Sequence, residues 1–227
     1  KNPPPPTFHL SPPHGRVLII AGSDSGGGAG IQGDIKTVSA LGSYAMTAIT
    51  ALTAQNSLGV FGIHSVPEEF IAQQIDVCLS DIGADAIKTG MLHSAGVIET
   101  VHHALHTMHH ALPLIVDPVM VAKGGSPLLE AEALDALKTL LIPRATIITP
   151  NLPEAELLLG RAIDEKKMED AARALLDLGC GAVLLKGGHG TRETLTDVLV
   201  TRTAPALILT APRIHTRHTH GTGCTFA

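Results

Sequence analysis

The sequence predicts a three-layer α/β domain, with a mostly parallel central sheet, helices on both of its faces, and an antiparallel hairpin at one edge. Short apolar runs of strand length alternate with helix-length segments along most of the chain. Because parallel neighbours need a long crossover, this alternation indicates strands joined through helices. Residues 196–209 break the alternation with two strand-like runs and a short turn, which predicts the hairpin.

The first elements follow from apolar spacing and turn residues. Residues 16–21 (RVLIIA) form an apolar run that ends in a glycine-rich turn, and residues 31–41 carry apolar side chains at helical spacing. We predict a buried strand that leads into a helix. Residues 44–52 predict the next strand, and a capping box of Ser65 and Glu68 predicts the start of the next helix.

The same alternation continues through the second half of the chain. Further strands are predicted at residues 86–88, 114–117, 146–149 and 182–186. Further helices are predicted at residues 95–111, 130–141, 153–159 and 168–178. In such sheets ligands bind at the carboxyl ends of the strands, so candidate functional residues are sought there.

Composition limits the class of protein. With 227 residues, 44% of them hydrophobic and 16% charged, the chain can bury one large core. A net charge of −5 and few aromatic residues disfavour a nucleic-acid partner. No apolar run reaches the roughly 20 residues of a membrane helix, so we expect no membrane association.

Two segments lie at the ends of the predicted domain, which spans residues 16–227. Residues 1–15 are rich in proline and are expected to form a flexible leader rather than a signal peptide. At the other end the chain stops just after a glycine-rich turn of the kind that leads into a helix, so we expect it to be truncated there.

Three cysteines lie far apart in the sequence, without a CxxC pair. This pattern favours a reducing compartment, and we expect a cytoplasmic protein. Cys78, on an amphipathic helix, and Cys180, beside a core strand, are interpreted as small buried hydrophobic residues.

The glycine-rich turn from Gly22 to Gly30 follows the first strand and opens a helix, where backbone N–H groups attract anions. It fits neither a dinucleotide fingerprint nor a Walker A loop, so the glycines could equally serve close packing. Asp34 lies just inside the following helix, where the helix dipole favours a carboxylate, and it could simply be a solvated helix-start charge. Gln55, after the next strand, could read a heteroaromatic edge, or could simply be solvated.

Two strand ends carry polar side chains. Asn151 and Glu154 could supply oxygen ligands to Mg²⁺ beside a nucleotide, or could form a helix capping box, and the two interpretations weigh equally. Lys186 ends another apolar strand, where it could contact a phosphate or lie in a simple turn.

The turn from His220 to Thr225 (HGTGCT) is the most specific feature. The backbone N–H groups of Gly221, Thr222, Gly223 and Cys224 can converge on the charge of a transferring phosphoryl group. Cys224 begins a predicted helix, so we expect its pKa to be lowered and a thiolate to be available as a base. The alternative for an isolated cysteine is a buried hydrophobic side chain.

Seven segments together resemble the hydroxymethylpyrimidine and hydroxymethylpyrimidine-phosphate kinases of thiamine biosynthesis, within the ribokinase superfamily. In chain order they are AGSDSGGGAGIQGDIKT, TALTAQNS, KTGML, DPVM, TPNLPEAELL, KGGH and HTHGTGCT. The resemblance implies a ribokinase-like fold, ATP and Mg²⁺, and two successive phosphorylations of 4-amino-5-hydroxymethyl-2-methylpyrimidine. A homodimer is also expected.

The resemblance also implies residue roles. Cys224 would be the catalytic base, and the pyrimidine pocket would be formed by Gly22, Ala29, Asp34, Gln55, Met91 and Val119. Lys186, with Asn151 and Thr222, would contact the nucleotide. Asp117, Asn151 and Glu154 would lie near Mg²⁺.

Three residues depart from the family pattern. Gly33 stands where alanine is expected, and His215 and His218 stand where asparagine is more usual. The alternative functions are a pyridoxal kinase of the same family and a non-catalytic pyrimidine-binding protein or inactive fragment.

Overall fold

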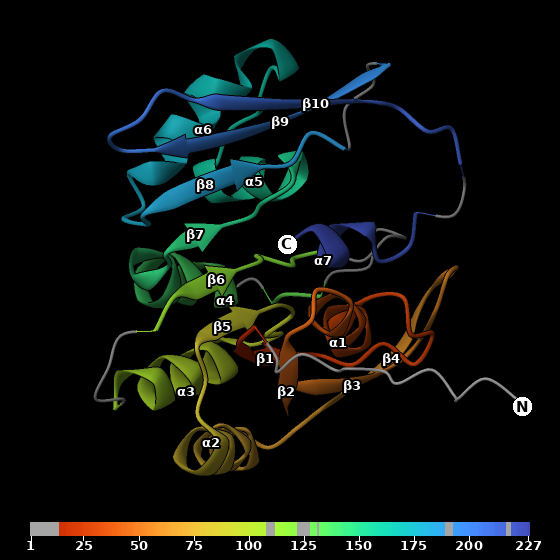
Figure 1. Ribbon diagram of the computed structural model, residues 1–227, viewed down its shortest axis with the longest axis vertical. Coiled ribbons are helices and arrows are strands. Elements are labelled where there is room, and N and C mark those ends of the chain that lie inside the picture. The colour runs from red at the N-terminus through yellow and green to blue at the C-terminus, as the bar shows by residue number, and fades with distance from the viewer. Residues whose placement is uncertain (1–13, 108–111, 122–127, 131, 189–192, 217–218) are drawn as a thin grey trace, which may run out of the picture.

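The computed structural model describes residues 14–107, 112–121, 128–130, 132–188, 193–216 and 219–227. Its main sheet has eight strands in the order β10-β9-β8-β7-β6-β5-β1-β2 (Figure 1). The six strands from β2 to β8 in that order run parallel, and β9 and β10 are antiparallel at one edge. The predicted sheet and its edge hairpin are confirmed. The strands of the main sheet are β1 (Arg16–Ala21), β2 (Tyr44–Ile49), β5 (Ala86–Thr89), β6 (Leu114–Val116), β7 (Ile147–Ile148), β8 (Ala182–Leu185), β9 (Thr194–Thr201) and β10 (Leu207–Pro212).

Helices cover both faces of this sheet, as predicted. One face carries α1 and α7, and the other carries the helices from α2 to α6 (Figure 1). The helices are α1 (Gly30–Ala40), α2 (Glu68–Val77), α3 (Ala95–His106), α4 (Ala133–Ala136), α5 (Leu152–Leu159), α6 (Met168–Leu176) and α7 (Thr222–Phe226). The helix predicted at residues 130–141 contains only α4 and a π-helical turn, Leu137–Leu141.

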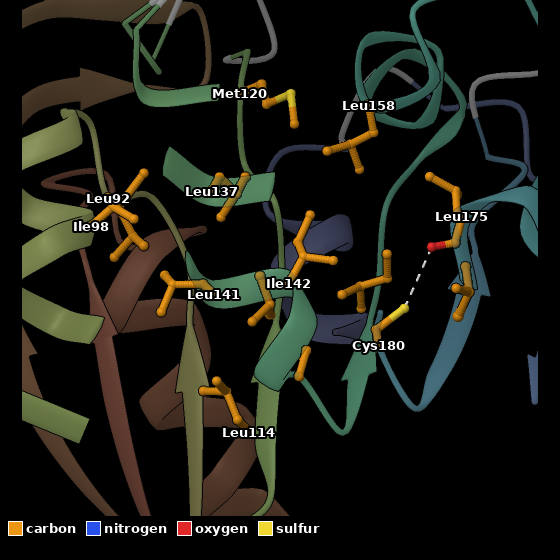
Figure 2. Close-up of a cluster of buried hydrophobic side chains, with 14 of the residues drawn as sticks. Leu92, Ile98, Leu114, Met120, Leu137, Leu141, Ile142, Leu158, Leu175 and Cys180 are labelled. Atoms are coloured by element: carbon orange, nitrogen blue, oxygen red, sulfur yellow. Dashed lines mark hydrogen bonds between the residues drawn. The ribbon is translucent and has the colours of Figure 1, made fainter. Parts of the chain in front are cut away.

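The main core lies between the sheet and the helices from α2 to α6. Alternate side chains of the strands point into it, which is why short β-branched runs fit here. Figure 2 shows part of this cluster, including Leu141, Ile142 and Leu175, none of which is exposed. Cys180 is buried in the same cluster, and its Sγ lies 3.7 Å from the Leu175 carbonyl oxygen. The other cysteine expected to be buried, Cys78, is half-buried.

A second sheet was missed by the sequence prediction. The strand predicted over residues 44–52 is two strands, because the chain leaves the main sheet at Thr50 and continues as β3 (Ala51–Asn56), which pairs with β4 (Gly59–Ser65). Buried Thr50 fixes this bend, since its Oγ1 donates to the Met91 carbonyl oxygen at 2.7 Å. Apolar periodicity cannot reveal a change of partner strand.

The capping box predicted for α2 was wrong. Ser65 ends β4, and the N-cap of α2 is Pro67, whose side chain cannot cap the helix. Glu68 instead lies in the first turn of α2, where a carboxylate interacts favourably with the helix dipole. Within the described residues, no helix has both the length and the apolar character needed to cross a bilayer.

Candidate active site

Two buried ion pairs lie at the carboxyl ends of the parallel strands. Lys88 Nζ in β5 lies 2.9 Å from Asp34 Oδ1 in α1. Lys186 Nζ, just after β8, lies 3.0 Å from Asp117 Oδ1, just after β6. All four residues are at most 8% exposed. The sheet therefore gathers two cations and two carboxylates at the edge where α1 and α7 meet (Figure 1).

Asp34 is not the solvated helix-start charge that was one of its two interpretations. It is 2% exposed, and its second oxygen, Oδ2, has no hydrogen-bond partner among the described residues. Burial raises the pKa of this carboxyl group, although the charge and hydrogen bond of Lys88 oppose the rise. The result is a buried carboxylate with one satisfied oxygen and one free acceptor.

Cys224 lies in α7, against α1 and close to both ion pairs. A Cβ built at Gly33 would lie 3.9 Å from the Cys224 Cβ, and one built at Gly223 would lie 3.9 Å from Lys186 Nζ. The structure thus brings the turn before Cys224 to Lys186 and to the Asp34 side of α1.

The predicted lowering of the Cys224 pKa was wrong. Burial and the negative charge of Asp117 raise the pKa of this thiol to about 11, although the charge of Lys88 acts in the opposite direction. The effect of burial on the pKa exceeds that of the nearby N–H groups, because a buried thiolate loses more hydration energy than hydrogen bonds from those groups replace. Near neutrality Cys224 is a thiol.

The turn before Cys224 requires glycine at one position. Gly221 has a φ of +82°, and a Cβ there would overlap the Gly28 carbonyl oxygen. Thr222 Oγ1 donates to the Thr219 carbonyl oxygen at 3.0 Å. The turn is therefore closed on itself and packed directly on the glycine-rich turn that follows β1.

Three of the predicted pocket residues lie together. Met91 and Val119 belong to a small cluster with Ala51 and Leu128, and a Cβ built at Gly22 would lie 2.6 Å from the Met91 methyl carbon. Gln55 lies in β3 and is half-buried, with its Oε1 3.1 Å from Thr53 Oγ1. Thr53 Oγ1 in turn donates to the Ser23 carbonyl oxygen at 2.7 Å, which joins Gln55 to the turn after β1.

Asn151 and Glu154 form the capping box of α5. Asn151 Oδ1 accepts from the Glu154 N–H at 2.9 Å, and Glu154 Oε2 accepts from the Asn151 N–H at 2.8 Å. Glu154 is nonetheless 5% exposed, and burial followed by the charge of Asp117 raises its pKa to about 7. No three His, Cys, Asp or Glu side chains form a metal-binding group within the described part of the chain.

Sequence reasoning missed Lys88, Asp24 and His220. A lysine inside the apolar strand AIKT signals a buried cation that needs a partner, and it was overlooked. Asp24 Oδ2 lies 2.7 Å from His220 Nε2, across 196 residues of sequence. His215 pairs with Glu193 at the surface, 3.0 Å away, and His218 lies outside the described residues.

The chain is similar to known proteins over most of its length. Residues 24–227 match the family model described as phosphomethylpyrimidine kinase. The chain is 50% identical to the hydroxymethylpyrimidine/phosphomethylpyrimidine kinase of Bacillus subtilis over 216 residues, 93% of this chain and 78% of that protein. It is 53% identical to the thiamine biosynthesis bifunctional protein ThiED of Geobacter sulfurreducens over 216 residues, 95% of this chain but 44% of that protein.

The fold also matches a solved structure. The pyridoxal kinase of Staphylococcus aureus in complex with AMP-PCP superposes with a TM-score of 0.83 at 35% identity, covering 93% of this chain and 77% of that one. The predicted ribokinase-like fold is confirmed.

Proposed function

The chain belongs to the phosphomethylpyrimidine kinase family, and we propose on that premise that it phosphorylates 4-amino-5-hydroxymethyl-2-methylpyrimidine and then the monophosphate, using ATP, in thiamine diphosphate biosynthesis. Members of this family are phosphotransferases. The observation that supports the proposal most directly is the contact of residues 221–224 with both α1 and Lys186. A ring-binding region at α1 and a phosphate-binding region at Lys186 would then both lie next to residues 221–224.

The ring would be bound by Asp34, Gln55 and the small apolar cluster. Asp34 Oδ2 is a buried acceptor without a partner among the described residues, which suits the amino group of the pyrimidine. Gln55 offers a donor and an acceptor to a ring nitrogen. The floor would be lined by Gly22, Ala29, Met91 and Val119.

Phosphoryl transfer would take place between that ring and Lys186. In the first step Cys224 first loses its thiol proton to solvent; the hydroxymethyl oxygen then attacks the γ-phosphorus of ATP, its proton passes to the Cys224 thiolate, and ADP leaves. Lys186 and the N–H groups of Gly221, Thr222 and Gly223 would bind the transferring phosphoryl group, with Asn151 beside the nucleotide. In the second step an oxygen of the monophosphate is the nucleophile.

The residues near Asp117 suit a divalent cation. Asp117 and Glu154 are both buried, and the charge of Asp117 raises the pKa of Glu154, so the two carboxylates repel each other. A cation held near both carboxylates would relieve that repulsion. Asp117 and Glu154, with Asn151, would hold Mg²⁺ through water, and Mg²⁺ would neutralise phosphate charge there.

Replacing Cys224 with alanine separates the two steps. The first phosphorylation should fall by about 10² to 10⁴-fold, because a general base is lost. The second should change much less, because the phosphate monoester, with a pKa of about 6, needs no base. Each step is measured by following ADP release with the alcohol or with its monophosphate.

Wild-type turnover in the first step should also rise about tenfold per pH unit above neutrality. The thiol must lose its proton before it can act, and its pKa is about 11. This rise should vanish in Cys224→Ala and persist in Cys78→Ala. Equal losses in both steps, or none, would contradict the assignment of Cys224 as the base.

A pyridoxal kinase is the second candidate function, because the matching structure from Staphylococcus aureus is a pyridoxal kinase. Both substrates present a hydroxymethyl group beside a nitrogen heterocycle. Parallel assays with the two alcohols distinguish the functions, and a second phosphorylation favours the pyrimidine. Binding of the pyrimidine without any turnover would instead indicate a non-catalytic protein.

A cytoplasmic location and a homodimer complete the proposal. Cys78, Cys180 and Cys224 are all unpaired, which suits a reducing compartment. The mass of the native protein in solution, from light scattering, tests the dimer.

A further inference from the structure

Two turns from distant parts of the chain touch at the proposed site. One follows β1 and spans residues 22–29, and the other precedes α7 and spans residues 219–221. The Gly28 carbonyl oxygen packs against Gly221, and a Cβ built at Gly28 would lie 2.5 Å from His220 Cδ2. The first turn carries proposed ring-pocket residues, and the second leads into Cys224.

Asp24 organises the first turn from inside. It is 1% exposed, and it accepts hydrogen bonds from three backbone N–H groups, those of Gly26 at 2.8 Å, Gly28 at 3.0 Å and Ala29 at 2.8 Å. Burial alone would raise the pKa of Asp24, but the Ala29 N–H, His220 and the Gly26 N–H together lower it. Asp24 therefore remains a carboxylate that fixes the path of the chain.

The same carboxylate reaches the second turn. Asp24 Oδ2, the oxygen that accepts from Gly28 and Ala29, lies 2.7 Å from His220 Nε2. The His220 side chain is 14% exposed and the Asp24 side chain is 1% exposed, so water competes little for this contact. Among the described residues it is the one ion pair between the two turns.

We propose that Asp24 and His220 are positioning residues that set the distance between the pyrimidine pocket and the phosphoryl-transfer turn. This inference rests on the proposed kinase function. One oxygen joins the Ala29 N–H to His220, so the two turns cannot shift independently while it is bound. A misplacement of about 1 Å can cost about 10²-fold in rate, which makes such a connection valuable for transfer.

The position of His220 argues for alignment rather than for loop folding. Three N–H groups already hold the first turn on Asp24, so loss of the imidazole leaves that turn formed. Beyond the packing of Gly221 on Gly28, the Asp24 contact is the ion pair that ties the second turn to the first. The expected signature is a loss of kcat with pyrimidine affinity retained.

The test uses the full-length protein with His220→Phe, which fills the space beside Gly28 but cannot donate to Asp24. We expect kcat for the first phosphorylation to fall by about 10 to 100-fold, with the Kd for the pyrimidine, from calorimetry, within about twofold of wild type. His220→Gln keeps an N–H donor and should restore most of the loss. His106→Phe, at an exposed site in α3, is the matched control and should behave as wild type.

A second readout does not depend on turnover. The rate of alkylation of Cys224 by iodoacetamide, followed by mass spectrometry, should rise about tenfold in His220→Phe, because the freed turn exposes the thiol. It should stay near the wild-type rate in His220→Gln and His106→Phe.

The outcomes separate the two proposals. If the wild type does not phosphorylate the pyrimidine but alkylation responds as expected, the kinase proposal fails and the connection between the turns stands. If the wild type is active and His220→Phe changes neither kcat nor alkylation, the positioning role is wrong and the kinase proposal stands. A rise in the pyrimidine Kd that matches the loss of rate would also overturn it, because the ring pocket would then depend on His220.

Discussion

The core under the helices from α2 to α6 and the polar edge around Lys88 and Lys186 are both buried, but they are built differently. In the core, Leu141, Ile142 and Leu175 need only shape complementarity to be stable (Figure 2). At the polar edge each charge of the two ion pairs is paired with an opposite charge from a distant segment. Replacing each ion pair with apolar side chains of similar volume would often leave the protein as stable or make it more stable. The buried charges therefore indicate a role in the reaction rather than in stability.

Breaking one ion pair should give the largest effect. Lys88→Met leaves the Asp34 carboxylate buried without its cation, so we expect the free energy of unfolding to fall by about 3 to 5 kcal/mol. Activity should be lost as well, because Asp34 would take up a proton. Urea denaturation and the pyrimidine assay measure the two effects.

The double variant Asp34→Leu with Lys88→Met sharpens this test. Removing both charges should recover most of the stability, because no unpaired charge remains. It should recover no activity. A double variant as unstable as Lys88→Met would mean that the pair stabilises the fold, and the contrast between the two regions would fail.

A core substitution should show the opposite pattern. Leu175→Ala, in α6, should lower the free energy of unfolding by about 2 to 5 kcal/mol, because it leaves a cavity in a fully buried cluster. The kcat of the molecules that remain folded should be unchanged. Leu58→Ala is the control, since that side chain is 82% exposed. A fall in kcat that exceeds the unfolded fraction would show that the two regions are coupled.

Glu154→Gln should give the smallest effect on stability, and that effect should be visible only through its pH dependence. A folded-state pKa of about 7, above the ordinary 4.5, means that the folded protein binds the proton more tightly. This contribution to stability is complete below about pH 4.5 and is lost as the pH rises towards 7, by at most about 3 kcal/mol. The amide introduced by the substitution would keep an acceptor for the Asn151 N–H and remove that loss.

The variant should therefore exceed the wild type in stability at about pH 8 by more than at about pH 5. Guanidinium denaturation at both pH values measures the difference. An equal difference at the two values would show that Glu154 is ionised throughout this range in the folded protein.

Local patterns predicted the elements well and the site only partly. The bounds of β1 agree with the prediction because RVLIIA is apolar throughout and ends at glycine. The capping box of Asn151 and Glu154 could also be foreseen, because both partners lie within four residues. The bend at Thr50 and the partner of Lys88 could not be foreseen, because each depends on which distant segment the fold brings near.

The same limit applies to the pKa of Cys224. Its sequence position suggested N–H groups that would favour a thiolate, but the deciding factors are burial and the charge of Asp117, more than a hundred residues earlier. The sequence shows which backbone N–H donors lie near Cys224, whereas only the three-dimensional structure shows how much hydration its thiolate would lose.

The contact between Asp24 and His220 has a consequence for biosynthesis. A ribosome adds residues in order, so the histidine is made 196 positions after the carboxylate it joins. During translation the nascent polypeptide can form its first strands and helices while this contact is still lacking. The enzyme would thus gain activity only after residue 220 has also left the exit tunnel.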